Sequence, residues 1–126
     1  MLLRIIIILF FTITVYPQSY NFIHYKIIDG LSASQVFALS QDNNGALLIG
    51  TQGGGINQFD GNNFDQITIE DGLSSNSIYS FYIDSNKSLY GTVNGLTVFD
   101  GKTYKNYDHK DGLPSNSIWR ISKDDE

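Results

Sequence analysis

One motif occurs three times along this chain of 126 residues. Each copy begins with Asp-Gly-Leu, continues through small polar residues, and ends in an aliphatic residue followed by an aromatic one. The copies occupy residues 29–37, 71–79 and 111–119, so their starts lie 42 and 40 residues apart. A self-similar period of this length is typical of a propeller or a solenoid, so the repeat predicts the architecture before any local motif is considered.

Each of the first two copies leads into four short apolar segments separated by turn residues. The first segment ends in an acid, the second ends in Gly-Thr, and Asp-Gly separates the third from the fourth. The predicted strands after the first segment are 46–51, 56–59 and 64–69 in one unit and 88–92, 96–99 and 104–109 in the other. Four antiparallel strands with Gly-rich turns in about 40 residues predict a propeller blade. A sandwich or barrel is the alternative, but neither repeats a motif at a fixed period.

The first segment of each unit, 36–42 and 78–84, is a nearly continuous apolar run closed by Asp. A half-exposed strand would alternate apolar and polar side chains, so this run predicts an inner strand buried on both faces. The second strands carry Gly50 and Gly91 close to their ends. Glycine weakens a strand, so these positions predict the close approach of a neighbouring backbone or ring.

The expected fold is therefore all-β, an incomplete β-propeller spanning residues 19–126. Blade units cover about 30–70 and 72–110, and a third blade begins at 112 with its first strand at 118–121. The residues before the first Asp-Gly-Leu match the fourth-strand pattern, since Phe22 aligns with Phe64 and Tyr104. This segment predicts a leading outer strand, the element that completes the last blade of a closed propeller.

Residues 1–18 follow the order of a secretory signal peptide, a positive charge at Arg4, an apolar run over 5–15, and then polar residues. The run is shorter than the roughly 20 residues that span a membrane. The small residues expected before a cleavage site are missing, so an uncleaved anchor stays as the alternative. The segment predicts export to the periplasm or the extracellular space.

Composition and charge exclude several functions. The net charge of -5 disfavours nucleic-acid binding, which depends on clustered Lys and Arg. The chain has no cysteine, hence no disulfide or thiolate site. His24 and His109 lack ligand-spaced partners, and Asp42-Asn43-Asn44-Gly45 lacks the alternating ligands of a calcium loop. We therefore predict no catalytic residue, no metal site, no cofactor and no enzyme activity.

The candidate ligand-binding face comes from a fold-level analogy, because propellers usually bind ligands with the loops between blades and the loops joining second to third strands. These loops are rich in hydroxyl and amide groups, which suit a polar ligand such as an oligo- or polysaccharide. The predicted contact residues are Ser34, Gln35, Gln52, Ser75, Asn76, Asn94, Ser115 and Asn116. The alternative is that they are only turn residues.

The motifs at 48–51 (Leu-Ile-Gly-Thr), 59–61 (Phe-Asp-Gly) and 71–76 (Asp-Gly-Leu-Ser-Ser-Asn) resemble, in order and spacing, the two-component regulator propeller repeat. The resemblance covers 22–126, although the family usually has Trp where this chain has Leu48 and Tyr90. It implies the periplasmic sensor region of a hybrid sensor histidine kinase, in which further blades, an immunoglobulin-like domain, a membrane helix and a kinase follow.

By this resemblance the chain is expected to be an N-terminal fragment that senses a ligand and has no kinase activity of its own. Its expected partners, besides a polar ligand, are the remaining blades or a copy of itself. The protein is expected to contact the membrane only through an uncleaved N-terminal segment or through downstream parts that this sequence lacks. A secreted propeller scaffold without a kinase is the alternative function, and a propeller hydrolase or lyase is a third.

Overall fold

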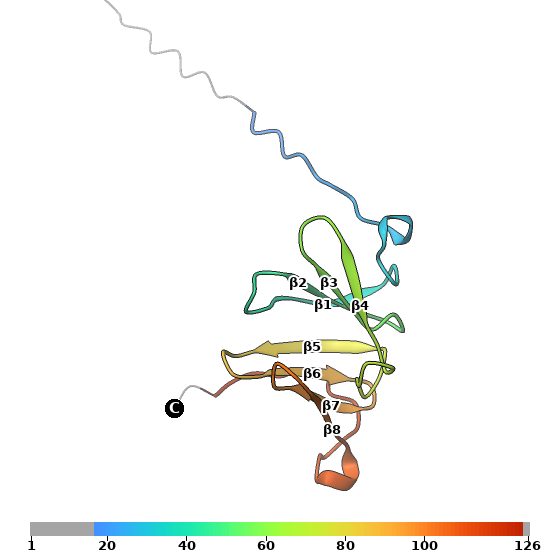
Figure 1. Cartoon of the computed structure of the whole chain (residues 1–126), viewed down its shortest axis with the longest axis vertical. Coiled ribbons are helices and arrows are strands. Elements are labelled where there is room, and N and C mark those ends of the chain that lie inside the picture. Colours follow the sequence, from blue (N-terminus) through green and yellow to red (C-terminus); the bar gives the residue numbers. More distant parts are fainter. Residues whose placement is uncertain (1–16, 125–126) are drawn as a thin grey trace, which may run out of the picture.

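The computed structural model describes residues 17–124 as two four-stranded antiparallel sheets (Figure 1). In each sheet the strands are neighbours in chain order, which is the connectivity of a meander. The first sheet contains β1 (Val36–Gln41), β2 (Leu47–Thr51), β3 (Ile56–Phe59) and β4 (Phe64–Ile67). The second sheet contains β5 (Ile78–Ile83), β6 (Ser88–Thr92), β7 (Gly95–Phe99) and β8 (Tyr104–Tyr107). The predicted pair of four-stranded blades is confirmed.

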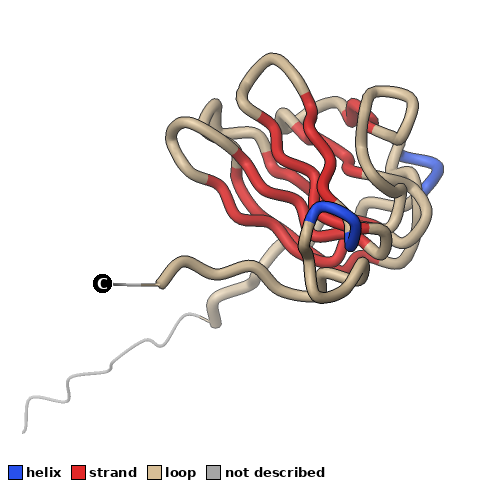
Figure 2. Tube along the Cα trace, turned by 90° about the horizontal axis from the view of Figure 1, so that it is seen from below, coloured by secondary structure: helices blue, strands red, loops and turns tan. Residues whose placement is uncertain are grey.

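The two sheets lie one above the other in Figure 1, and β5 lies against β1 and β2. The only helical segments in the described part of the chain are two single 3₁₀ turns, η1 (Ile27–Asp29) and η2 (His109–Asp111), drawn in blue in Figure 2. None of the described helices is long and apolar enough to cross a membrane. The expected signal segment at 1–18 falls almost entirely on residues outside the described range.

The core lies between the sheets. Ile56 and Ile78 are fully buried, and Leu48, Leu73 and Tyr90 complete the cluster with them. Each such side chain contributes roughly 1.5–3 kcal/mol when it leaves water, so this cluster is the main attachment of one sheet to the other. Both sheets therefore form one packed unit.

The expectation that both inner strands are buried on both faces is wrong for β1, and in β5 only Ile78 and Ser80 are buried while the other four residues are half-buried. Its partner in the repeat, β5, has a first residue that is fully buried, whereas Val36, Phe37 and Leu39 of β1 are exposed. Strand β5 packs against the first sheet, but within residues 17–124 no second sheet covers the other side of β1. Burial here depends on the neighbouring sheet, which the apolar pattern does not report.

The Asp-Gly-Leu motif forms the turn that leaves one outer strand and leads to the next inner strand. The carboxylate of Asp71 accepts a hydrogen bond from the backbone N–H of Thr68 at 2.8 Å, and Gly72 has φ +121°. Such a positive φ favours glycine, and the following Leu73 is buried in the core. The equivalent carboxylates of Asp29 and Asp111 make the same bond at 2.8 and 2.9 Å.

This turn explains why the fourth strands are shorter than predicted. Strands β4 and β8 end at Ile67 and Tyr107, two residues before the predicted ends at 69 and 109. The next residue of each unit, Thr68 or Asp108, already gives its N–H to the motif's aspartate. The backbone is therefore turning where the apolar pattern suggested that the strand continued.

The two flanking strands predicted at 22–27 and 118–121 are absent from the structure, which is a correction to the expected fold. The first segment is extended coil running into η1, with the Tyr25 ring 4.9 Å from that of Phe59. In the second, the Ile118 N–H donates to the carbonyl oxygen of Thr92 at 2.9 Å, without a ladder. A strand needs a hydrogen-bonded neighbour, and the described residues offer none to either segment.

The prediction for the strand glycines is confirmed. A Cβ atom on Gly50 would lie 3.0 Å from Cγ2 of Ile78 and 3.1 Å from the ring of Phe81, both on β5. A Cβ atom on Gly91 would lie 2.6 Å from the carbonyl oxygen of Ile118. In each sheet this glycine therefore makes room for the first residues of the next unit, which fixes the spacing between successive units.

Candidate functional site

The structure brings the predicted binding loops together at one end of the strands. The backbone N–H of Gln52 donates to the carbonyl oxygen of Gln35 at 3.0 Å, and that of Gly55 donates to the carbonyl oxygen of Asn76 at 2.7 Å. In the second sheet the N–H of Gly95 makes the equivalent bond to Asn116. Each loop between blades is thus tied to the loop between the second and third strands of a sheet.

Several of the predicted contact groups already have a structural partner. The side-chain oxygen of Asn76 accepts from the N–H of Ile69 at 2.9 Å, and that of Asn116 accepts from His109 at 2.7 Å. The hydroxyls of Ser75 and Ser115 accept from backbone N–H groups two residues further on. These bonds stabilise the turns in which the side chains lie.

Six of the predicted residues are exposed on this face, namely Ser34, Gln35, Gln52, Asn94, Ser115 and Asn116. Of these, Asn94 lines a shallow pocket of about 270 Å³ that also includes Ser74 and Asn106. The Asn94 side-chain amide donates to the carbonyl oxygen of Ser74 at a long 3.4 Å, which leaves it available for another partner. Asn94 is therefore the predicted residue best placed to meet a ligand on the loop face.

Two buried polar residues that the sequence reasoning missed hold these loops to the sheets. Asn57 of β3 is fully buried, accepts from the backbone N–H of Ser32 at 3.0 Å and donates to its hydroxyl at 2.6 Å. In the second sheet, Thr97 accepts from the N–H of Ser74 at 2.9 Å. Buried polar groups are costly unless they are paired, so these bonds fix the loop positions. Their role is structural.

A larger cavity, here called the interblade cleft, lies at the opposite end of the strands, where β1 ends and β6 begins. Its volume is about 370 Å³, within the range of small-molecule sites. It is lined by residues of both sheets: Asp42, Asn43, Asn44, Leu48, Gln58, Ile67, Ser85, Asn86, Lys87, Ser88, Tyr90, Phe99, Asp100, Gly101 and Tyr104. The sequence analysis placed no ligand there.

The wall of the cleft on the first sheet is held rigidly by Asp42. One carboxylate oxygen accepts from the side-chain amide of Gln58 at 2.7 Å, and the other accepts from the N–H groups of Asn44 and Ala46 at 2.9 Å. The side-chain amide of Asn43 donates across to the carbonyl oxygen of Asp84 on the second sheet at 2.8 Å. These neutral donors position a carboxylate without cancelling its charge.

The floor and the second wall of the cleft are aromatic. Tyr90 is buried, and burial raises the pKa of its hydroxyl to about 12, so it is a neutral donor at physiological pH. The rings of Phe99 and Tyr104 stack 4.5 Å apart, and burial followed by the charge of Asp71 raises the pKa of Tyr104. The cleft thus combines an apolar floor with convergent hydroxyl, amide, carboxylate and Lys87 ammonium groups.

Two cleft residues differ in type from their counterparts in the repeat. Gln58 occupies the position of Val98, and the strand pairing places Tyr90 at the position of Ile49, so the grouping of Tyr90 with Leu48 in the family comparison is wrong by one residue. Positions that serve only the sheet accept an aliphatic side chain, so a polar group in one unit indicates a local role.

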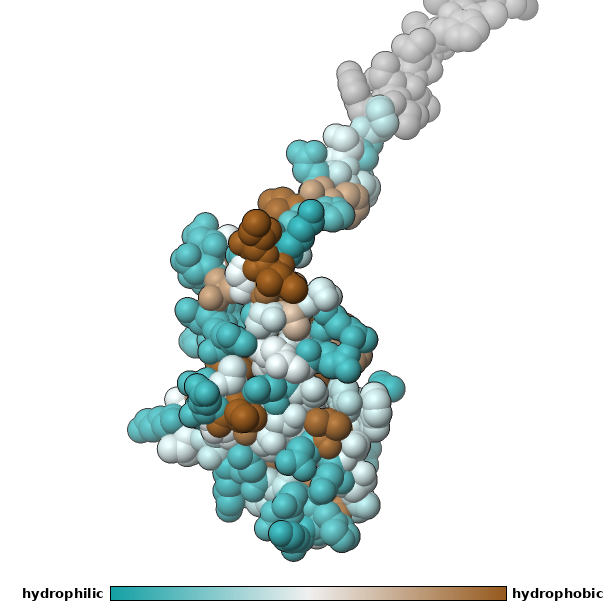
Figure 3. All heavy atoms as spheres, turned by 90° about the vertical axis from the view of Figure 1, so that its right-hand side faces the viewer, coloured by the Kyte–Doolittle hydropathy of each residue, from teal (hydrophilic) through white to brown (hydrophobic). Residues whose placement is uncertain are grey.

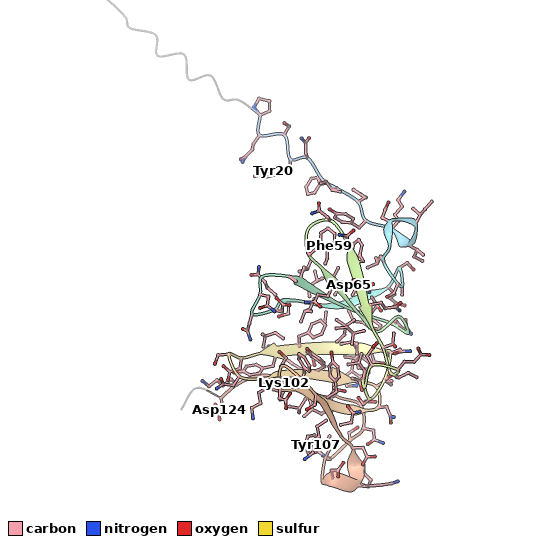
Figure 4. The ribbon with its side chains drawn as sticks, viewed as in Figure 1. Tyr20, Phe59, Asp65, Lys102, Tyr107 and Asp124 are labelled. Carbon is pink, nitrogen blue, oxygen red and sulfur yellow. The ribbon has the colours of Figure 1, made fainter. Side chains whose placement is uncertain are left out.

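Figure 4 shows the side chains of the described residues. Among residues 17–124, no group of three or more His, Asp or Glu side chains is close enough to hold a metal ion. The labelled acids Asp65 and Asp124 lie on different parts of the molecule, the first on β4 and the second near the C-terminal end. The arrangement is suited to binding a ligand.

The fold and these two faces define a class, since consecutive four-stranded meanders packed side by side are propeller blades. The model of the two component regulator propeller family matches residues 30–53, which comprise Gly30 and Leu31 of the first motif, β1 and β2. The resemblance noted from the sequence motifs is therefore confirmed over this part of the chain. No curated protein matches the chain.

A solved structure extends the likeness to most of the chain. It is the extracellular domain of the hybrid two component system BT3049 from B. thetaiotaomicron, with 28% sequence identity and a TM-score of 0.74. The match covers 83% of this chain and 15% of that one. This chain is therefore similar to a small part of an extracellular sensor region and has the same propeller-type fold.

Proposed function

We propose that this chain is a ligand-sensing propeller segment of the extracellular region of a hybrid two component system protein. The observation that carries the proposal is the likeness of 83% of the chain to the extracellular domain of such a protein. The chain spans 15% of that domain. That a membrane helix and a histidine kinase are part of the same protein is therefore also a proposal. The chain itself binds and does not catalyse.

The interblade cleft is the better supported of the two candidate sites. Its Asp42 carboxylate is held by the side-chain amide of Gln58 on the first sheet, and its aromatic side chains come from the second sheet. On the loop face, by contrast, the side-chain oxygens of Asn76 and Asn116 already accept hydrogen bonds from backbone N–H groups of their own turns. A polar ligand such as an oligosaccharide suits the cleft, because sugar hydroxyls can pair with both donors and acceptors.

The test is a titration of the ¹⁵N-labelled full chain with cellobiose, maltose, mannobiose and xylobiose, followed by amide NMR shifts. We expect the shifts to centre on Asn43, Asn44 and the side-chain amide of Gln58. Gln58→Val installs the residue of the other sheet, so it should abolish binding and leave the fold intact. Asn94→Ala on the loop face is the matched control and should bind normally.

Each result separates the parts of the proposal. If only Asn94→Ala lost binding, the ligand would bind at the loop face and the proposed sensing function would still stand. An absence of shifts with all four sugars would exclude this ligand class. Sensing itself is tested by joining the chain to a two component kinase and measuring whether the sugar that binds changes autophosphorylation.

We also propose that the chain is exported by residues 1–18. A reporter such as alkaline phosphatase, fused after Glu126, should be active in the periplasm of a bacterial host. Replacing the apolar residues at 5–11 with Ser should retain the reporter in the cytoplasm. Cytoplasmic retention of the unaltered fusion would contradict the proposal.

A secreted scaffold without a kinase is the second candidate function. The observation that favours it is the exposed apolar surface of β1 and of the segment before η1. Figure 3 shows apolar surface where the described N-terminal segment joins the first sheet, and Phe22, Ile23 and Ile28 are among the exposed residues there. A kinase encoded downstream in the same reading frame would decide against the scaffold.

A further inference from the structure

The interblade cleft contains one carboxylate whose counterpart in the other unit is held differently. Asp42 and Asp84 have the same place in the repeat, directly after the inner strand. Asp42 lines the cleft and accepts from the side-chain amide of Gln58 at 2.7 Å, whereas the carboxylate of Asp84 accepts from its neighbour Ser85. The second unit has Val98 at the position of Gln58, and valine carries no amide. A bond found only in the first unit therefore fixes the Asp42 carboxylate in the cleft.

The Asp42 carboxylate can accept one further hydrogen bond. A carboxylate has about four acceptor sites. The donors to Asp42 are the side-chain amide of Gln58 and the backbone N–H groups of Asn44 and Ala46, and all of them are neutral. The bond from Gln58 uses its amide nitrogen, so its carbonyl oxygen is left to accept. This end of the cleft therefore offers a negative charge and two acceptor oxygens.

The fixed charges of the cleft are negative. Its lining contains two acids, Asp42 and Asp100, and one base, Lys87. The Asp100 carboxylate is held by the backbone N–H groups of Lys102 and Thr103. Lys87 is exposed, and its flexible side chain can carry the ammonium into water. The net charge of -5 on the whole chain adds to the attraction for a cation.

The aromatic side chains of the second sheet suit a cation as well. Tyr104 is half-buried in the cleft and stacks on Phe99 with ring centroids 4.5 Å apart. The face of an aromatic ring attracts an ammonium group and also packs against apolar parts of a ligand. A ligand with a positive charge next to a largely uncharged ring therefore matches both walls.

We propose that the interblade cleft selects saccharides that carry an ammonium group, with the ammonium bound between the Asp42 carboxylate and the Gln58 carbonyl oxygen. An ammonium has three hydrogen-bond donors, so it can pair with both oxygens, whereas a hydroxyl has one. Its bond to a carboxylate is also about twice as strong as a neutral hydrogen bond. This inference rests on the proposed binding of an oligosaccharide and names its chemical class, an amino sugar.

The test is an NMR titration of the ¹⁵N,¹³C-labelled full chain with cellobiose and two analogues that replace one hydroxyl on each ring by an ammonium or by an acetamide. The ammonium analogue should bind about threefold to tenfold more tightly than cellobiose at low salt. Sodium chloride should reduce this advantage, because it screens the charge. The acetamide analogue has no charge and should have no such advantage. The carboxyl ¹³C signal of Asp42 should shift with the ammonium analogue.

Three variants assign the preference to its residues. Asp42→Asn removes the charge and keeps an oxygen for the turn, so it should bring the affinities for the ammonium analogue and cellobiose to within about twofold. Glu70→Gln removes the same charge from an exposed turn outside the cleft and is the matched control, in which the preference should persist. Lys87→Gln removes the cleft's own cation and should enlarge the preference by about twofold. Amide spectra check that each variant has folded, and the salt dependence of the native chain needs no variant.

The outcomes separate this inference from the proposed function. If cellobiose binds and the ammonium analogue binds no more tightly, the inference is wrong and saccharide sensing still stands. If none of the sugars binds, both are wrong. A preference that persists in Asp42→Asn would assign the ammonium to another group and overturn the inference. Tighter binding of a glucuronic acid disaccharide than of the ammonium analogue would also overturn it, since Lys87 would then be the recognising residue.

Discussion

Strands β1 and β5 have the same place in the repeat and nearly the same apolar pattern, yet they have opposite environments. The first residue of β5, Ile78, is 0% exposed, whereas its counterpart Val36 is 40% exposed. The difference arises because β5 lies against β1 and β2, and the outer side of β1 has no sheet against it within the described residues. The same local sequence therefore makes a core strand or a surface strand, according to its neighbour.

The second pair that makes this point is Gly50 and Gly91. Both are the residue before the last in the second strand of a sheet, and both make room for the next unit. Gly50 meets the side chains of Ile78 and Phe81, which are fixed within a sheet, whereas Gly91 meets Ser80 and the backbone of Ile118, a residue outside any strand. The residues that contact Gly50 from the next unit therefore belong to a complete four-stranded sheet, whereas the residue that contacts Gly91 from the next unit belongs to a short segment outside any sheet.

The largest expected difference in stability comes from truncating the first residue of each inner strand, Ile78 in β5 and Val36 in β1. Ile78→Ala removes a fully buried side chain and should lower the free energy of unfolding by about 2–5 kcal/mol. Val36→Ala at the equivalent exposed position should change it by about 0.5 kcal/mol or less. Urea unfolding measures both values, and equal losses would show that β1 is as well covered as β5.

A smaller effect is expected from filling the two glycine positions. Gly50→Ala forces its Cβ against Ile78 and Phe81 and should cost about 1–3 kcal/mol in the free energy of unfolding. Gly91→Ala should cost less, because Ser80, whose hydroxyl has no hydrogen-bond partner, can rotate and Ile118 can move.

The Gly91→Ala change has its own spectroscopic signature. Displacement of Ile118 would separate Trp119 from Tyr79, so the tryptophan emission should shift to longer wavelength. Gly50→Ala should leave that emission unchanged and serves as the matched control. A greater loss of stability in Gly91→Ala than in Gly50→Ala would contradict the comparison of the two contacts.

The smallest expected effect is on the pH dependence of stability, at the Asp-Gly turn between the third and fourth strands. The two sheets should behave alike there. Backbone N–H groups of Asn63 and Asn62 lower the pKa of Asp60, and those of Thr103 and Lys102 lower the pKa of Asp100, both from an ordinary value of 3.8. A lowered pKa means that the charged form stabilises the fold. This stabilisation is present above pH 3.8 and is lost as the pH falls through the lower pKa of the folded state.

Carboxyl ¹³C NMR titration should find both groups with pKa values below 3.8 in the folded chain. Asp60→Asn and Asp100→Asn should each remove part of the acid dependence of unfolding, by similar amounts, because both carboxylates are fully exposed and make the same turn bonds. A pKa at or above the ordinary value in one sheet only would show that the two hairpins differ.

Most of the strand order could be predicted from the sequence, because the signals involved are local. Asp60-Gly61 and Asp100-Gly101 mark hairpins, and Gly50 and Gly91 mark close approaches, all within a few residues of the strands that they affect. The two predicted strands that are missing have one cause. The segments at 22–27 and 118–121 have strand-like residues but no hydrogen-bonded neighbour, so no ladder forms.

The candidate site was less predictable than the fold. The loop residues Asn76 and Asn116 have the right chemistry for a polar ligand, but turn bonds occupy their side-chain oxygens. The interblade cleft joins Asp42 and Gln58 of one sheet to Tyr90 of the other. No spacing rule links residues this far apart, so they could be found only by seeing the fold.

The sequence by itself determined the repeating unit, the order of its four strands and the glycine and aspartate turns between them, because each depends on the conformational preferences of a few adjacent residues. The tertiary structure alone decided which inner strand is buried and where a cleft opens. Those properties depend on the surface that a distant segment presents, and a segment's own residues do not specify its neighbour.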